Sequence, residues 1–113
     1  MWIGHAALGV SDVATAADFW TKLGLREVHR DDEVAIMELR GGTHLVLFPD
    51  ADVQSNASFD LMVDDLAATR AQWSDLGLEV SPIEQGSIHA AFVVRDPDGR
   101  RVVVNDSHVV GEV

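Results

Sequence analysis

The chain has 113 residues and no cysteine, which excludes a disulfide framework and thiol chemistry. Its formal net charge of −11 argues against nucleic acid as a partner, because phosphate binding requires a basic footprint. No stretch approaches the roughly 20 apolar residues that a membrane span requires. The first ten residues have no basic region before their apolar run, so we expect no signal peptide and a cytoplasmic protein.

The first half of the chain predicts the element order βαβββ. Residues 3–10 alternate between apolar and other side chains as a half-buried strand does, with Leu8 and Val10 on one face and His5 on the other. Ser11 or Asp12 offers an N-cap to a helix. Gly24 ends that helix, since glycine adopts the left-handed conformation easily. Strands are predicted at 25–30, 34–39 and 43–48, the last two joined by a tight hairpin at residues 41–42.

The second half predicts the same order. Residues 57–63 form a strand, and Asp64 or Asp65 caps a helix that ends at Gly77. Strands follow at 78–84, 89–95 and 100–105, and the last two are joined by the turn DPDG at residues 96–99. The chain therefore divides into module one (residues 1–49), a polar linker (50–57) and module two (58–108). We expect the whole of 1–113 to form a single domain.

The two modules also share residues at matching positions. Eight positions in an eighteen-residue window are identical 53 residues later, without a gap. The buried stripes of the two helices include Trp20 and Trp73, which we interpret as core residues and not as ligand-stacking ones. Such a repeat indicates one module used twice. The identical positions are Leu8, Val10, Asp12, Ala14, Trp20, Leu23, Gly24 and Leu25, which recur as Leu61, Val63, Asp65, Ala67, Trp73, Leu76, Gly77 and Leu78.

Paired βαβββ modules, a strand-borne histidine, a Trp-x-x-Leu-Gly helix end in each half and a closing DPDG turn resemble the vicinal oxygen chelate superfamily. That superfamily includes glyoxalases, extradiol dioxygenases and bleomycin resistance proteins. The resemblance implies an α+β fold in which the two tandem modules form a curved mixed sheet around a cavity, with the helices outside. It also implies a homodimer.

In metal-using members of the superfamily, four ligands hold one divalent ion, which acts as a Lewis acid. Carried over to this chain, the first-strand ligand of module one is His5, and its counterpart in module two is Ser58. The two last-strand glutamates fall on Val46 and Val103. Valine offers no ligand atom, so we expect no metal cofactor at these positions.

Other residues could substitute for the lost ligands. His44 lies two residues before Val46 and therefore on the same strand face, and Asp60 stands in the same relation to Ser58. His5, His44 and Asp60 together form a His-His-carboxylate set, which can bind one divalent metal ion. Each replacement is displaced by about 6.6 Å along its strand, which disfavours a common centre.

The inward sheet faces predict a small-molecule site. Asp60 is an acid within an apolar strand, and Arg101 is a candidate to neutralise it. His29, His89 and His108 lie near strand ends and are expected to face solvent. The predicted ligand-binding residues are His5, His44, Val46, Phe48, Asp60, Met62, Val103 and Asn105.

Two functions follow from these residues. The first is a metal-free protein that binds or sequesters a small molecule in the sheet cavity, as in bleomycin resistance, and so serves antibiotic resistance. The alternative is a lyase or dioxygenase with a metal site rebuilt around His5, which would then be its catalytic residue. Neither function involves nucleic acid or a membrane.

Overall fold

The two halves of the sequence fold into the same order of secondary-structure elements. The structure, a computed structural model, describes residues 1–109 and 111. The first half contains β1 (His5–Val10), α1 (Val13–Leu23), β2 (Arg26–Arg30), β3 (Ala35–Glu38), the 3-10 turn η1 (Arg40–Gly42) and β4 (His44–Pro49). The second contains β5 (Leu61–Val63), α2 (Leu66–Asp75), β6 (Glu84–Gln85), β7 (Ala90–Arg95) and β8 (Arg101–Asp106).

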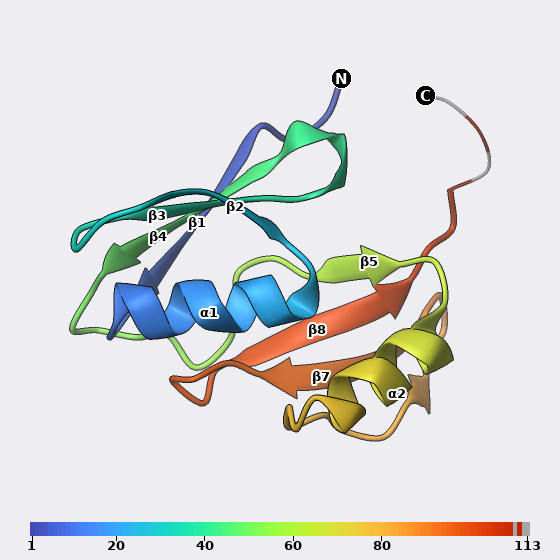
Figure 1. Cartoon of the computed structure of the whole chain (residues 1–113). Helices are drawn as coiled ribbons and strands as arrows, with labels where there is room; N and C mark the ends of the chain where they lie inside the picture. Colours follow the sequence, from blue (N-terminus) through green and yellow to red (C-terminus); the bar gives the residue numbers. More distant parts are fainter. Residues whose placement is uncertain (110, 112–113) are drawn as a thin grey trace. The chain divides into compact units, whose positions relative to one another are not determined.

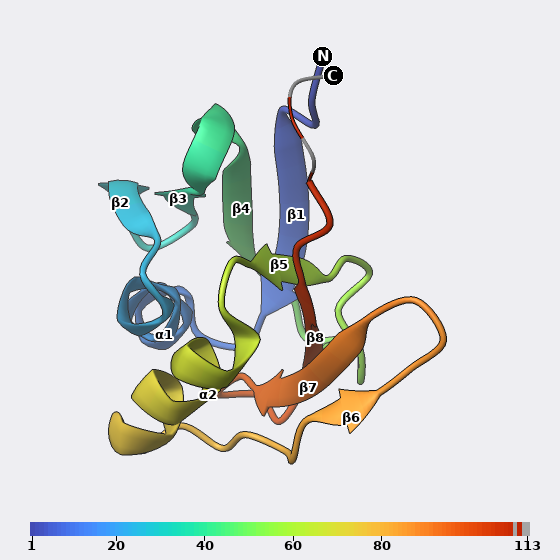
Figure 2. The same ribbon diagram turned by 90° about the vertical axis from the view of Figure 1, so that its right-hand side faces the viewer.

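Each half forms its own four-stranded mixed sheet. The strand order is β1-β4-β3-β2 in the first sheet and β5-β8-β7-β6 in the second (Figures 1 and 2). In both, the first strand pairs in parallel with the last one, and the remaining pairs are antiparallel. The predicted α+β class with tandem βαβββ modules is confirmed.

The chain separates into two compact units, residues 1–55 with 96–100, and residues 56–95 with 101–113. The prediction of a single domain stays a prediction. Within the part of the chain that the structure describes, no helix combines the length and the apolar character that crossing a membrane requires.

Helix α1 packs against one face of the first sheet. Its N-cap is Asp12, whose carboxylate accepts a hydrogen bond from the Thr15 N–H at 3.0 Å. Gly24 ends the helix with φ = 112°, a backbone angle that residues with a Cβ rarely adopt. Trp20 is completely buried, as the sequence predicts. The strand residues that form the core on this side are Leu8, Val10, Ala35, Met37, Leu45 and Leu47.

Helix α2 repeats this arrangement against β7 and β8 (Figure 2). Its N-cap is Asp65, and Gly77 follows the last turn with φ = 83°. The indole of Trp73 meets the ring of Phe92 edge to face, with ring centroids 5.7 Å apart. Trp73 is buried, so the assignment of both tryptophans to the core is confirmed.

Three predicted elements are shorter or differ in kind. The strand expected at 57–63 contains only Leu61–Val63, because the chain pairs briefly at Asn56 and then leaves the ladder. The strand expected at 78–84 reduces to a single bridge at Val80 and the two-residue β6, since Pro82 has no N–H to donate. The hairpin expected at residues 41–42 is present, since β3 and β4 pair antiparallel, but the 3-10 turn η1 joins its strands.

The turn between β7 and β8 belongs to the first unit and carries a buried ion pair. The side chains of Arg100 and Asp96 are 1% and 2% exposed, and Nη1 lies 3.3 Å from Oδ2. Nε of Arg100 donates to the carbonyl of Gln54 at 3.0 Å, and Nη2 donates to the carbonyl of Gly9. Burial raises the pKa of Asp96, while the N–H and the charge of Arg100 oppose that rise.

We expect Arg100→Met to lower the free energy of unfolding by about 3 kcal/mol, because it leaves a buried carboxylate without its cation. Urea denaturation measures the loss. Arg101→Met is the matched control, since Arg101 is exposed and its replacement should change stability by less than about 0.5 kcal/mol. Equal losses in the two variants would contradict this role of the ion pair.

Candidate functional site

The face of the first sheet that points away from α1 carries four of the predicted ligand-binding residues. Alternation along β4 buries Leu45 and Leu47, so His44, Val46 and Phe48 lie on the opposite face. His5 is the direct partner of His44 in the parallel ladder and is exposed. Phe48 remains 38% exposed, which leaves an aromatic ring available on this face.

The two histidines of this face form a polar cluster with a residue that the sequence analysis missed. The rings of His5 and His44 meet edge to face, with centroids 5.5 Å apart. Nε2 of His44 lies 3.0 Å from Oε1 of Glu38, and Arg26 pairs with the same carboxylate. The register of β3 and β4 places Glu38 directly opposite His44. Only this strand pairing reveals the contact, because the two residues are separated by η1 in the sequence.

The second sheet presents a corresponding face away from α2. Met62 and Asn105 are direct partners in the parallel pair β5·β8, and Val103 pairs with Val93 of β7. Met62 is 49% exposed, whereas Asn105 is buried at 6% exposure. This face therefore combines apolar side chains with one buried amide.

The environment of Asp60 differs from the prediction. Asp60 is exposed and precedes β5, so it is not an acid buried within an apolar strand. Its Oδ2 accepts a hydrogen bond from Nδ2 of Asn105 at 2.9 Å. The partner of Asp60 is thus the neutral amide of Asn105 and not Arg101. Ser58 is exposed and lies outside the strand.

These residues do not fit the divalent metal that the fold implies. Of the four positions where the resemblance places a metal ligand, those of Val46 and Val103 have no donor atom in the side chain. Ser58 offers only a neutral hydroxyl, a poor ligand for the transition metals that histidine prefers. His5 alone matches.

The alternative metal-ligand set of His5, His44 and Asp60 is only partly assembled. His5 and His44 are neighbours, but one ring nitrogen of His44 is already engaged with Glu38. Asp60 belongs to the second unit and is bonded to Asn105.

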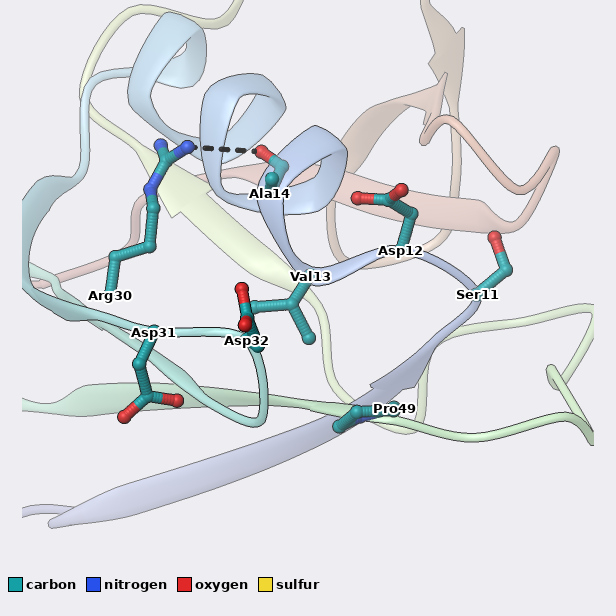
Figure 3. A pocket seen from close by; sticks show the side chains of 8 residues that line it. All are labelled: Ser11, Asp12, Val13, Ala14, Arg30, Asp31, Asp32 and Pro49. Atoms are coloured by element: carbon teal, nitrogen blue, oxygen red, sulfur yellow. Dashed lines mark hydrogen bonds between the residues drawn. The ribbon is translucent and has the colours of Figure 1, made fainter.

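A pocket of about 520 Å³ opens elsewhere on the first unit, beside the first turn of α1 (Figure 3). The charged groups of Asp12, Arg30 and Asp31 already have partners within the protein. Arg30 donates to Asp18 at 2.7 Å and to Glu27 at 2.8 Å. Asp31 accepts hydrogen bonds from two backbone N–H groups and contacts His29 at 2.7 Å. The pocket is lined by Ser11, Asp12, Val13, Ala14, Arg30, Asp31, Asp32 and Pro49.

Comparison with known families agrees with this architecture. The model of the glyoxalase-like domain matches residues 5–105, from the first residue of β1 almost to the end of β8. The chain belongs to the glyoxalase-like family. The predicted membership of the vicinal oxygen chelate superfamily is confirmed. None of the curated proteins compared with this glyoxalase-like chain matches its sequence.

Solved structures share the fold of this glyoxalase-like chain at low sequence identity. Lactoylglutathione lyase from Agrobacterium tumefaciens is 21% identical with a TM-score of 0.79, covering 98% of this chain and 97% of its own. The bleomycin resistance determinant encoded on transposon Tn5 is 23% identical with a TM-score of 0.75, covering 96% and 100%. The antibiotic-binding protein TnmS3 from a Streptomyces species is 21% identical with a TM-score of 0.81, covering 94% and 95%.

The pocket beside α1 generates a pH prediction. The contact with His29 and the N–H groups of Glu33 and Val34 lower the pKa of Asp31 from its ordinary 3.8 to about 2. Because this pKa is lower in the folded state, the carboxylate stabilises the fold above pH 3.8, and its contribution is lost as the pH falls toward 2. Carboxyl chemical shifts should show that low midpoint, and His29→Ala should raise it. An ordinary midpoint in the unaltered protein would contradict the assignment.

Proposed function

We propose that this chain is a small-molecule binding protein that holds its ligand without a catalytic metal and performs no reaction on it. The ligand would lie on the face of the first sheet that α1 leaves uncovered. We further propose that the protein acts in the cytoplasm as a homodimer and protects against a toxic compound such as an antibiotic. The bleomycin resistance determinant and the antibiotic-binding TnmS3, which share the fold, support this proposal.

One observation carries the proposal: valine stands at both positions where the resemblance implies a glutamate ligand. Val46 and Val103 lie on the uncovered faces of their sheets, in the same relation to β4 and β8. An apolar side chain at these points cannot hold an ion, but it can contact an apolar part of a ligand. A mostly apolar face with a few polar groups is the usual composition of a ligand site.

The exposed groups favour a ligand that is aromatic and positively charged. Phe48 and the ring of His5 offer flat surfaces on the first sheet, where a planar ring could stack. The net charge of −11 attracts cations over longer distances.

Titration calorimetry with untagged protein tests the proposal. The panel contains bleomycin, smaller planar aromatic cations and neutral aromatics of the same shape. We expect saturable binding of at least one cationic aromatic compound, with the same affinity in the presence of a chelator. Phe48→Ala should weaken that binding about tenfold, equivalent to about 1.4 kcal/mol.

Leu76→Ala is the matched control for Phe48→Ala. Leu76 is an exposed apolar residue (48%) that caps the C-terminal end of α2 and is not part of either uncovered sheet face. Its replacement should leave the affinity unchanged. No binding across the panel, or binding that a chelator abolishes, would contradict the proposal.

The second candidate function is a lyase or dioxygenase with a metal bound near His5. The cluster of His5, His44 and Glu38 favours it, because two imidazoles and a carboxylate are available on one sheet face. This candidate predicts one equivalent of metal in protein purified without chelator, and its loss in the double variant His5→Ala/His44→Ala. Metal content that is unchanged in that variant would exclude it.

A further inference from the structure

A second cluster of ligand-type side chains lies at the end of the second sheet, within the second unit. It consists of His89, Asp106 and His108, whose potential ligand atoms all lie within 4.8 Å of one another. His89 immediately precedes β7, Asp106 ends β8, and His108 follows two residues later. The sequence predicts that both histidines face solvent; His108 is exposed, whereas His89 is partly buried.

The geometry points to a binding site for a divalent transition-metal ion such as Zn²⁺, made by His89, Asp106 and His108. Two imidazole nitrogens and one carboxylate are a ligand set that such ions prefer. The three residues include none of the inherited metal positions and none of the residues assigned to the ligand face of the first sheet. The site is thus independent of the proposed binding function.

The interatomic distances are close to those of a metal centre. In a tetrahedral zinc site with bonds of about 2.05 Å, neighbouring ligand atoms are about 3.4 Å apart. Oδ1 of Asp106 lies 3.4 Å from Nδ1 of His89 and 3.6 Å from Nε2 of His108. The two imidazole rings are 4.3 Å apart and nearly perpendicular, at 82°. Small side-chain rotations would therefore bring the three atoms to a common centre.

The backbone holds these residues in place before any ion binds. The N–H of Ala90 donates to Oδ1 of Asp106 at 3.2 Å, which orients the carboxylate as a supporting hydrogen bond does in metal sites. Gly86 donates to the carbonyl of His89 at 2.8 Å. A Cβ at residue 86 would lie only 2.9 Å from that oxygen, so glycine permits this close approach. The N–H of Ser107 donates to the carbonyl of Val63 at 3.0 Å, which fixes the segment that carries His108.

Binding would exchange a proton for the ion. Nδ1 of His89 lies 3.2 Å from the carbonyl oxygen of Asp106, a distance at which it donates a hydrogen bond. A metal ion at Nδ1 displaces that proton to solvent, as metal binding to histidine commonly does. The carbonyl oxygen then becomes available as a further ligand. Because Asp106 and His108 are partly exposed, water can complete the coordination.

The cluster is peculiar to the second module. Aligning Leu47 of β4 with Val104 of β8, which pair with Ala35 and Phe92 respectively, gives the counterparts in the first module. These counterparts are Asp32, Pro49 and Ala51. Two of the three cannot bind a metal through their side chains. The duplicated architecture by itself therefore does not account for the cluster.

Titration of untagged, chelator-treated protein with Zn²⁺, and with Co²⁺ as a spectroscopic probe, tests the site. We expect one equivalent to bind, with Co²⁺ absorption typical of nitrogen and oxygen ligands. His108→Ala and Asp106→Asn should each weaken binding at least tenfold. Asparagine keeps an oxygen for the N–H of Ala90, so this variant should fold. Zn²⁺ should raise the Tm of the unaltered protein and not that of His108→Ala.

Two controls locate the ion. His29→Ala removes another exposed imidazole that pairs with a carboxylate, that of Asp31 at 2.7 Å, and should bind Zn²⁺ normally. His5→Ala/His44→Ala should also bind normally. No saturable binding would overturn the proposal. So would equal weakening in His29→Ala, or binding that is lost in His5→Ala/His44→Ala and kept in His108→Ala.

Discussion

Each four-stranded sheet packs one face against its single helix, and the alternation of side chains along the strands decides which residues remain outside that contact. In β1 and β4 the residues that meet α1 are aliphatic, so burying them stabilises the fold through the hydrophobic effect. His5, His44 and Phe48 are offset by one position and must lie on the other face. A shift of register by one residue would reverse both sets. The uncovered face is thus a direct consequence of how the core is packed.

The same alternation along the strands places the two valines outside the cores. Val46 and Val103 occupy the uncovered faces and not the cores, so they are not required by the packing of α1 or α2. The absence of a donor at these two positions therefore bears on the site and not on stability. Without donor atoms at these two positions, the residues can contact a small molecule but cannot hold the Lewis-acid ion that the superfamily uses there.

The sequence predicted the repeated order of elements, the two helices and the core tryptophans, because each depends on local patterns. Asp12 and Gly24 cap their helix through contacts within a few residues, and Trp73 follows the helical stripe. Contacts between distant residues were missed. Asp60 bonds to Asn105, and Arg100 reaches Gly9 and Gln54, across separations that no local pattern records.

Glu38 was missed because strand pairing, and not sequence spacing, places it beside His44. The second histidine cluster was missed for the same reason. His89 and Asp106 are 17 residues apart and meet only through the pairing of β7 with β8. A histidine near a strand end usually faces solvent. The hydrogen bond from Ser107 to Val63 instead brings His108 back toward the sheet.

The chain has two groups of side chains of the kind that bind metals, one around His5 and one around His89. The metal content of the purified protein therefore cannot be interpreted without knowing which group holds the ion. A bound ion in the purified protein would not by itself indicate catalysis, because His89, Asp106 and His108 lie outside the positions where the superfamily places its ligands. An ion there would join the start of β7 to the segment after β8 and so act on local stability. An ion near His5 would instead lie on the proposed ligand face and compete with that ligand. The position of the ion, and not its presence, therefore distinguishes an enzyme from a binding protein.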